Sequence, residues 1–342
     1  MLEKYTFNDV LIKPKYSEIT SRKNVDVSTS LHNIRLKLPI ISANMKTVTG
    51  VEMMRAMENN GGLGILHRFY PSRLEYKTEV FNMSLLNKAV SIGVQEDDKR
   101  LFDELFSAGA RIFCIDVAHG HHILVKNMIN YINDSFKWTK KDAKEQTTII
   151  AGNIATIDGY SALCDWGADV VKVGIGGGAG CTTRKNTGVG YPQLSALEEI
   201  WHRANSTQKR KQIISDGGCS NVGDICKALK YSDAVMLGSM LAGFDESNGT
   251  VFIDSKTEQK YKVYAGSASA YSKSTNKQPT DFIEGVVSEI PCRGSVISQL
   301  KSIKEGIQSA FSYVGANNIE EYHSKCEFIR ISPGAQKESK LI

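Results

Sequence analysis

The sequence lacks the features of disulfide-bonded, zinc-ribbon and membrane proteins. Its seven cysteines are odd in number and no two of them form a CxxC pair, so we predict neither a disulfide framework nor a structural zinc site. It contains no apolar run of about 18 residues that would span a bilayer, and no signal peptide opens it. We therefore expect a cytoplasmic protein that does not contact membranes.

An excess of charge of one sign is also missing. The net charge is +5 over 342 residues, and the lysines and arginines are scattered rather than clustered. Nucleic-acid binding requires a strong basic patch, so we predict no nucleic-acid partner. The small positive excess suits an anionic small molecule such as a phosphate. An apolar content of 41% is ordinary for a globular protein with a substantial core.

Eight short segments rich in β-branched residues recur along the chain, and most of them are apolar almost throughout. This pattern is typical of parallel strands that are covered on both faces. The segments are residues 39–45, 62–67, 89–94, 113–117, 148–153, 170–175, 212–217 and 234–239.

Helical patterns separate these strands. Thr49 is predicted to cap a helix that ends at Gly61, Thr156 caps one that ends at Gly167, and Ser220 precedes a third. Eight β/α alternations favour a (β/α)8 TIM barrel over an open sheet of about five or six strands. We predict a single domain over residues 1–342, with strands at about 39–240, a mobile lid or flap at about 251–291 that begins with a hairpin, a final helix at about 296–315 and no regulatory insert.

Polar residues at the carboxyl ends of the strands form the active face of such a barrel. These positions hold Asn44, His67, Asp116, Asn153 and Asp216. The seventh and eighth strands end in Asp216-Gly217-Gly218 and Gly238-Ser239, and TIM barrels often bind phosphate at these two loops through backbone N–H groups. We predict a phosphate site there; the alternative is that these glycines only form turns.

A glycine-rich loop follows the sixth strand, with five glycines in the seven positions 174–180. Such density costs conformational entropy and suits a backbone that takes unusual dihedral angles or lets a ligand approach closely. Cys181, at its end and beside two threonines and an arginine, is predicted to be a nucleophile. A flexible turn with an incidental cysteine is the alternative. Glu284 is a candidate for driving proton transfer through Thr183, and a solvated surface acid is an equal interpretation.

Three other patterns carry less weight. Gly174-x-Gly176-x-x-Ala179 matches a dinucleotide fingerprint only loosely, since no crossover helix is predicted after it. The histidines at 119, 121 and 122 lack carboxylate or cysteine partners at ligand spacing, so we interpret them as solvent-facing loop residues rather than metal ligands. No nucleophile elbow supports Ser/His/Asp catalysis.

Together these motifs resemble the family of IMP dehydrogenases and GMP reductases. The resemblance extends over essentially the whole chain, through residues 5–12, 39–45, 115–120, 174–193, 215–218, 236–243 and 312–316. It implies a purine 5′-nucleotide substrate, a nicotinamide cofactor and a thioimidate between Cys181 and purine C2. Lys46 and Asp281 depart from the residues usual at their positions, an acid or amide and an arginine.

Within this family the sequence is closer to the reductases. No segment can hold the pair of regulatory modules common in the dehydrogenases, and no arginine lies between Tyr264 and Pro291 to form their water-activating Arg-Tyr pair. Hydride delivery needs no such base, so the resemblance implies NADPH-dependent conversion of GMP to IMP and ammonia. The alternatives are an IMP dehydrogenase without regulatory modules and a non-enzymatic purine-nucleotide sensor.

The resemblance also implies residue roles. Cys181 attacks C2, and Thr183 with Glu284 protonates the departing ammonia. The substrate-binding residues are Asp216, Gly217, Gly218, Gly238, Ser239, Gly266, Ser267, Ala268 and Gly285. The cofactor-binding residues, some of them reaching across a subunit boundary of a homotetramer, are Ser21, Arg22, Arg68, Asp116, Val117, Ala118, Ile175, Gly176, Ser309, Ala310, Phe311 and Ser312. A K+ site is implied at the carbonyls of Gly176, Gly178 and Cys181, near Arg184.

Overall fold

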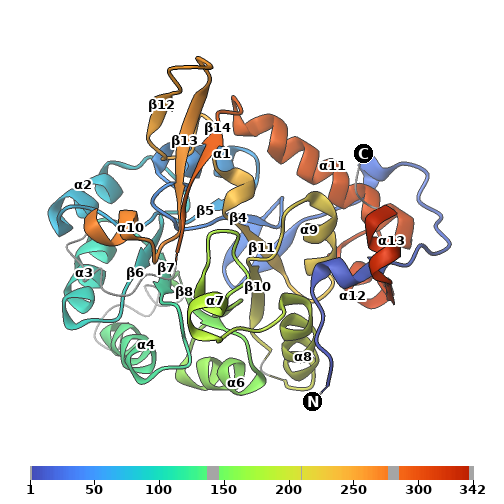
Figure 1. Ribbon diagram of the computed structural model, residues 1–342. Helices are drawn as coiled ribbons and strands as arrows, with labels where there is room; N and C mark the ends of the chain where they lie inside the picture. Colours follow the sequence, from blue (N-terminus) through green and yellow to red (C-terminus); the bar gives the residue numbers. More distant parts are fainter. Residues whose placement is uncertain (1, 137–145, 209, 276–284, 339–342) are drawn as a thin grey trace.

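The computed structural model describes residues 2–136, 146–208, 210–275 and 285–338, and a parallel β-barrel forms its centre (Figure 1). The hydrogen-bonded strand order is β5-β4-β11-β10-β9-β8-β7-β6. The barrel closes between β5 and β6, where Leu66 N donates to Ala89 O at 2.9 Å and Ser91 N donates to Leu66 O at 3.0 Å. Each predicted strand is confirmed, as β4 (Ile40–Ser42), β5 (Leu63–Gly64), β6 (Ala89–Ile92), β7 (Ile112–Asp116), β8 (Thr148–Ile154), β9 (Val170–Val173), β10 (Gln212–Asp216) and β11 (Ala234–Leu237).

Helices follow one another around the outside of the barrel (Figure 1). They are α1 (Val51–Asn59), α2 (Arg73–Asn82), α3 (Glu96–Ser107), α4 (Ile123–Ser135), α6 (Ile157–Trp166), α8 (Gln193–Asn205), α9 (Val222–Ala228) and α11 (Val296–Val314). In the described ranges no helix is both long and apolar enough to cross a membrane.

Three predicted helix caps have different outcomes. Thr156 caps α6 as predicted by accepting a hydrogen bond from Gly159 N, and Gly167 ends that helix at φ 101°. Thr49 does not cap α1, because its hydroxyl donates to Ala43 O at 2.6 Å and Gly50 is the N-cap residue. At α9 the cap is Asn221 rather than Ser220, since Asn221 accepts from Asp224 N. Local sequence therefore places a helix start to within about one residue.

The apolar side chains form two cores. An inner cluster fills the barrel and includes Ile41, Ile150, Val170 and Ile214, and an outer cluster lies between the barrel and its helices. Alternate residues of each strand point to the two cores, so every strand is buried on both faces. This explains why the strand segments are apolar almost throughout.

Short elements that the sequence analysis did not predict complete the barrel. A hairpin of β2 (Thr29–Leu31) and β3 (Ile34–Leu36) contributes its buried side chains to the inner cluster and so plugs the amino-terminal end of the barrel. Strand β1 (Val10–Ile12) pairs with β15 (Phe328–Arg330). The remaining short elements are η1 (Phe7–Asp9), η2 (Arg22–Asn24), α7 (Thr183–Thr187), η4 (Ser239–Leu241), α10 (Ala270–Thr275), α12 (Ile319–Lys325) and α13 (Pro333–Glu338).

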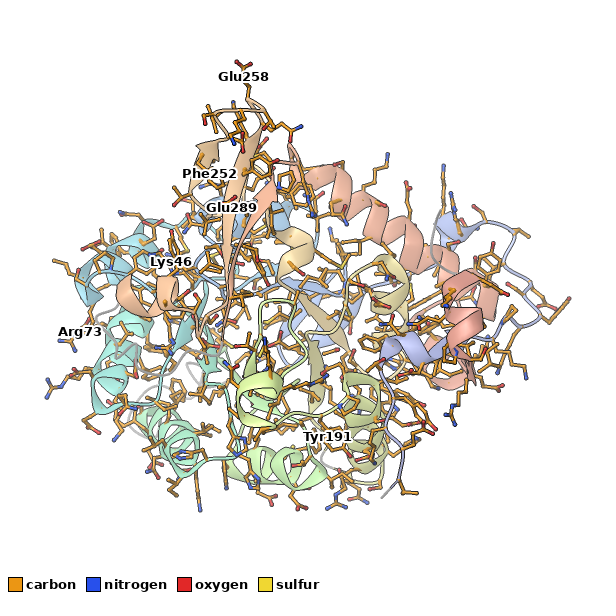
Figure 2. All side chains as sticks on the ribbon, viewed as in Figure 1. Lys46, Arg73, Tyr191, Phe252, Glu258 and Glu289 are labelled. Carbon is orange, nitrogen blue, oxygen red and sulfur yellow. The ribbon has the colours of Figure 1, made fainter. Side chains whose placement is uncertain are left out.

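A three-stranded antiparallel sheet follows the last barrel strand and projects from the barrel (Figure 1). Its strands are β12 (Val251–Ile253), β13 (Lys260–Ala265) and β14 (Val287–Pro291). The predicted hairpin is confirmed as β12 and β13, whereas β14 was not predicted. Figure 2 shows Phe252, Glu258 and Glu289 on this sheet, away from the barrel.

One buried lysine anchors this projecting sheet. Lys262 lies in β13 and is 5% exposed. Its ammonium donates to the carbonyl oxygens of Phe244, Asp245 and Ser247 at 2.7, 2.9 and 2.8 Å. A buried charge is stable only when its hydrogen bonds are made. The sheet is therefore attached to the loop after η4 by a fully used ammonium group.

We expect Lys262→Met to destabilise the projecting sheet by about 2 kcal/mol or more, because three carbonyl oxygens lose their donor. Thermal unfolding and the rate of proteolysis within residues 251–265 measure the effect. Lys260→Met, at an exposed position of the same strand, is the control. Equal behaviour of the two variants would contradict the anchoring role.

Candidate active site

A cleft opens at the carboxyl ends of the barrel strands and has a volume of about 350 Å³. Most of its walls come from residues just after a strand, as expected for the active face of a TIM barrel. The lining residues include Asn44, Met45, Arg68, Asp116, Val117, Ala118, Asn153, Lys172, Ile175, Gly176, Gly178, Cys181, Thr183, Asp216, Gly217, Tyr264, Gly266, Ser267 and Ala268.

The glycine-rich loop takes the unusual backbone that its composition predicts. Gly174 has φ 150°, and a Cβ atom there would lie 1.9 Å from the carbonyl oxygen of Asp216. Gly176 has φ 77° and lies against the side chain of Arg184. Only glycine fits the first of these positions, because any side chain would collide with the backbone of the neighbouring strand. The start of the loop is therefore fixed by backbone packing, and the role of Cys181 stays a prediction.

Cys181 lines the cleft at the end of this loop. Its Sγ donates to Thr183 Oγ1 at 3.2 Å, and Thr183 begins the short helix α7. Cys114 and Cys226 are poorer nucleophiles, since burial raises the pKa of each thiol to about 12. Cys181 is half-buried and open to the cleft. The geometry thus places one accessible thiol beside one hydroxyl.

Residues 285 and 286, which lead into β14, are hydrogen-bonded to the cysteine loop. Val286 N donates to Gly180 O at 3.0 Å, and Cys181 forms a β-bridge with Gly285. Gly266 N in turn donates to Val286 O at 3.0 Å. The predicted substrate residues at 266–268 thereby line the cleft. Glu284, the predicted partner of Thr183, lies outside the described residues, as does Asp281.

A polar cluster forms the floor of the cleft. Asp216 Oδ2 accepts from Lys172 Nζ at 2.7 Å and from Asn153 Nδ2 at 2.9 Å. Lys172 is 3% exposed and was missed by the sequence analysis. The signal for it is a single lysine in the otherwise apolar segment 170–173. A charge within a buried strand indicates a buried counterion.

Tyr264 is a second cleft residue that the sequence analysis missed. Its ring lies 3.3 Å from the position of a Cβ on Gly180, and its hydroxyl lies 3.3 Å from that of Gly238. The hydroxyl is hydrogen-bonded to Ser239, and burial with the nearby Asp216 raises the pKa of Tyr264 to about 12. It connects the eighth strand with the cysteine loop. No local pattern identifies it, since β13 returns to the barrel only in three dimensions.

The opposite wall holds the inner part of the predicted cofactor site. Arg68 Nε lies 3.5 Å from Asp116 Oδ2, and Val117 and Ala118 continue this wall. Arg68 Nε is buried and has no hydrogen-bond partner among the described residues. A buried donor without a partner fits the binding of a polar group.

Figure 2 shows Lys46 near α10, where its ammonium lies 5.4 Å from the centre of the Tyr271 ring.

The other predicted cofactor residues do not line this cleft. Ser21 caps η2 and Arg22 begins it, and η2 packs against α11, which carries Ser309 to Ser312. Phe311 is fully buried and stacks on Tyr322, with ring centres 4.0 Å apart. Ala310 instead lines a second cavity, of about 790 Å³.

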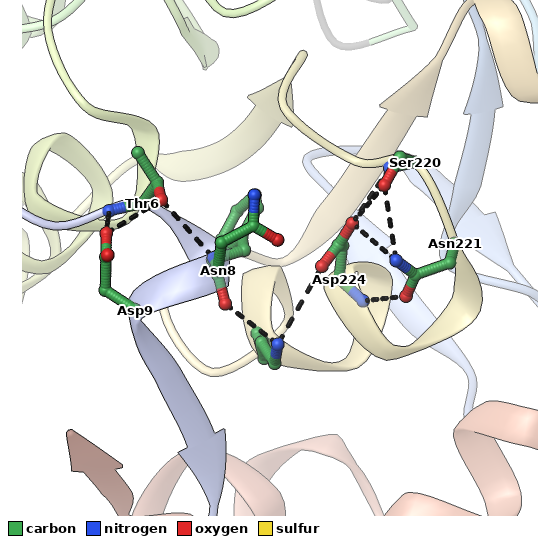
Figure 3. A network of polar contacts seen from close by, with 8 residues as sticks. Thr6, Asn8, Asp9, Ser220, Asn221 and Asp224 are labelled. Atoms are coloured by element: carbon green, nitrogen blue, oxygen red, sulfur yellow. Dashed lines mark hydrogen bonds and ion pairs between the residues drawn. The ribbon is translucent and has the colours of Figure 1, made fainter. Parts of the chain in front are cut away.

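A polar network lines the second cavity (Figure 3). Asp224 is 2% exposed and accepts from Ser220 Oγ at 2.8 Å and from Asn221 Nδ2 at 2.9 Å. Lys227 Nζ donates to Phe7 O at 2.8 Å. A Cβ on Gly218 would lie 3.3 Å from the Phe7 ring. The N-terminal segment therefore supports the loop after β10.

The metal predictions have separate outcomes. The histidines at 119, 121 and 122 are exposed, and among the described residues no group of three or more His, Cys, Asp or Glu side chains could hold a metal ion. Gly178 O, one of the predicted K+ ligands, accepts from Cys181 N at 3.0 Å. Arg184 donates to Tyr191 O and packs over Gly176. The K+ site remains a prediction.

Comparison with known proteins decides the family. The family model described as the IMP dehydrogenase / GMP reductase domain matches residues 4–341. The chain belongs to this family. Named relatives include the GMP reductase of Buchnera aphidicola subsp. Acyrthosiphon pisum, 39% identical over 345 residues that cover 96% of this chain and 95% of that one. Human GMP reductase 2 is 36% identical over 348 residues, which cover 96% and 94%.

A solved structure agrees with this assignment. The chain is similar to a variant GMP reductase from Trypanosoma brucei in complex with guanosine 5′-monophosphate, with a TM-score of 0.89, 26% identity and coverage of 100% of this chain and 98% of that one. The predicted family and the TIM-barrel fold are confirmed. The chain is therefore an oxidoreductase of a family that uses a nicotinamide cofactor.

His67 makes the stability of this face depend on pH. Burial, with a smaller effect of Lys46, lowers the pKa of His67 to about 3 from the ordinary 6.5. The folded protein keeps it neutral while the unfolded chain takes up a proton below pH 6.5. Its contribution to stability is thus complete above pH 6.5 and is lost as the pH falls toward 3. We expect a loss of about 2 kcal/mol between pH 8 and pH 5.

Urea unfolding at pH 8 and pH 5 measures this loss, and His67→Gln removes its part of the difference. The exposed His202, changed to Gln, is the matched control and leaves the difference intact. An unchanged pH dependence in His67→Gln would show that His67 titrates normally in the folded protein.

Proposed function

We propose that the protein catalyses the reductive deamination of GMP to IMP and ammonia, with NADPH as the hydride donor. The observation that carries this proposal is the pair of Cys181 Sγ and Thr183 Oγ1, 3.2 Å apart in a cleft that Gly217 of the neighbouring loop after β10 also lines. The family match over residues 4–341 and relatives named GMP reductase support it.

In the proposed reaction the Cys181 thiolate attacks C2 of the purine. The C2–N2 bond then breaks, ammonia leaves with a proton relayed through Thr183, and a thioimidate remains. A nicotinamide held by Arg68, Asp116, Val117 and Ala118 would supply the hydride that C2 receives. Breaking of the C2–S bond returns the thiolate and releases IMP. Nucleophilic attack by a thiolate with a neighbouring proton relay is the general pattern of covalent catalysis.

The residues around the thiol fit the two ligands. We assign the ribose to Asp216 and the phosphate to the loops at Gly217, Gly218, Gly238 and Ser239, where backbone N–H groups follow strand ends. The nicotinamide would be held by the wall of Arg68, Asp116, Val117 and Ala118, with Ile175 and Gly176 opposite. The Nε of Arg68 lies 3.5 Å from Asp116 Oδ2 without a hydrogen bond, and it fits a polar cofactor group. Gly176, Gly178, Cys181 and Arg184 are proposed to bind K+.

We propose that the cofactor residues of η2 and α11 act in a second copy of the chain. The elements that carry Ser21 and Arg22 (η2) and Ser309–Ser312 (α11) pack together, and these residues lie outside the cleft of their own chain. We therefore assign them to the cofactor of a neighbouring subunit in a homotetramer.

The reductase direction is favoured over IMP oxidation by the composition of the lid. Hydrolysis of the thioimidate needs a base that activates water, and no arginine lies between Tyr264 and Pro291 to act with a tyrosine. Hydride transfer to C2 needs no such base. The proposed direction therefore uses only groups that the chain contains.

Two mixtures test the direction. We expect oxidation of NADPH with GMP, faster than with NADH, and no reduction of NAD with IMP, followed through absorbance of the reduced nicotinamide. Cys181→Ala should abolish turnover, because the covalent step is lost. Turnover only in the IMP mixture would contradict the proposal, and tight GMP binding without turnover in either mixture would favour a nucleotide sensor.

The proton relay has its own test. We expect Thr183→Val to lower kcat about 100-fold or more with little change in the KM for GMP, since a relay acts only in the chemical step. Glu284→Gln should have the same effect. Thr182→Val is the matched control, because the Thr182 hydroxyl contacts Asn186 rather than Cys181. An equal kcat for the variants at 182 and 183 would exclude Thr183 as the relay.

A further inference from the structure

A lysine stands alone in the apolar interior of the barrel. In β9, Val170 and Lys172 point inward, and Val170 packs in the inner cluster with Ile150 and Ile214. The side chain of Lys172 is 4% exposed. An apolar residue of similar length would fill this position without the cost of removing an ammonium from water. Packing therefore does not explain the lysine.

The neighbouring strand is built to admit this side chain. Gly152 of β8 lies beside Lys172, and a Cβ on Gly152 would be 2.7 Å from Lys172 Cβ and 2.6 Å from its carbonyl oxygen. A register shift between Gly152 and Ile154 then interrupts the alternation of β8. Such an irregularity redirects the following side chain. It brings Asn153 into the cleft beside Lys172.

Lys172 and Asn153 act on the same oxygen of Asp216. Lys172 Nζ and Asn153 Nδ2 lie 2.7 and 2.9 Å from Oδ2, so this oxygen has two donors. Oδ1 has no hydrogen-bond partner in the part of the chain that the structure describes, and Asp216 lines the cleft. The two contacts fix the plane of the carboxylate. They leave its second oxygen for a ligand.

The charge of Lys172 matters as much as its hydrogen bond. Asp216 directly precedes Gly217 and Gly218, where the phosphate of the nucleotide is proposed to bind, and a carboxylate so placed would repel a dianion. The ammonium of Lys172, 2.7 Å from Asp216 Oδ2, offsets this repulsion with its positive charge. Burial alone would lower the pKa of Lys172, but Asp216, Cys114 and Asp116 raise it above its ordinary value, so the ammonium stays charged.

We propose that Lys172 is a positioning residue for nucleotide recognition: it holds Asp216 with Oδ1 toward the ribose diol and compensates its charge beside the phosphate. This inference rests on the proposed function, in which Asp216 binds the ribose of GMP. Asn153 shares the first task, because it contacts the same oxygen, but it carries no charge for the second.

The test is a double-mutant cycle on the KM for GMP. We expect Asp216→Asn and Lys172→Met each to raise this KM about tenfold or more, with kcat and the KM for NADPH within about threefold of the parent. The double variant has neither the carboxylate nor the ammonium, so no unpaired charge remains in the barrel. We therefore expect the double variant to fold even if Lys172→Met alone does not. Its KM for GMP should equal that of Asp216→Asn, because Lys172 acts through Asp216. Lys172→Arg should recover part of the affinity.

The control separates recognition from stability. Arg210→Met breaks another ion pair, at 2.7 Å to Asp233, at the amino-terminal ends of the strands and far from the cleft. It should lower the melting temperature and leave the KM for GMP unchanged.

Each contrary outcome has one meaning. A normal KM for GMP in Asp216→Asn would overturn the ribose assignment of the proposed function. A KM in the double variant well above that of Asp216→Asn would show that Lys172 acts independently of Asp216. An increase confined to the KM for NADPH would mean that Lys172 supports Asp116 instead. Either of the last two results would overturn the inference about Lys172.

Discussion

The site depends on the contact between two backbones, where the loop after β9 lies directly on the end of β10. At Gly174 the distance from a notional Cβ to the Asp216 carbonyl oxygen is 1.9 Å, so no side chain can stand between them. This contact sets the distance between the cysteine loop and the loop at Gly217 and Gly218. The proposed nucleophile and the proposed phosphate loop, carried by adjacent strands, can then meet one small molecule. This spacing requires glycine at position 174, because the side chain of any other residue would push the two strand ends apart.

Electrostatics organise the floor of the same cleft. Two cations, Arg68 and Lys172, lie beside two carboxylates, Asp116 and Asp216. Each carboxylate has a neighbouring cation, so these four side chains together add little net charge to the cleft. Such an arrangement holds polar side chains in place in a region of low dielectric without repelling an anionic ligand. It resembles a binding surface more than a stabilising ion-pair network, because apolar residues would stabilise the barrel equally well.

The fold was predictable because its signals are local and repeated. Each barrel strand is a short apolar run, and its position was correct because a parallel strand is buried on both faces. The glycine loop and Cys181 were predictable for a similar reason, since glycine density and a thiol are visible in the sequence itself. Tyr264 was not, because β13 contacts Gly180 and Gly238 only through the return of the projecting sheet to the barrel. Lys172 was visible as one charge in an apolar segment, but its partner stands 44 residues away along the chain. Residues whose meaning depends on a distant partner are those that local patterns miss.

The connection between the projecting sheet and the cysteine loop has a consequence for the chemistry. Gly285 and Val286, just before β14, pair with Cys181 and Gly180 of the cysteine loop. Val286 also accepts a hydrogen bond from Gly266 N, just after β13. The projecting sheet and the loop that carries the thiol are therefore joined by hydrogen bonds into one unit. Lys262 attaches this unit to the barrel through three carbonyl oxygens. Two contacts position the loop that carries the thiol. One is the backbone contact at Gly174, and the other is the hydrogen bonding to the residues that lead into β14. In the proposed reaction, a thioimidate on Cys181 would lie between these two backbone supports, which would limit the access of water to C2 and favour hydride transfer.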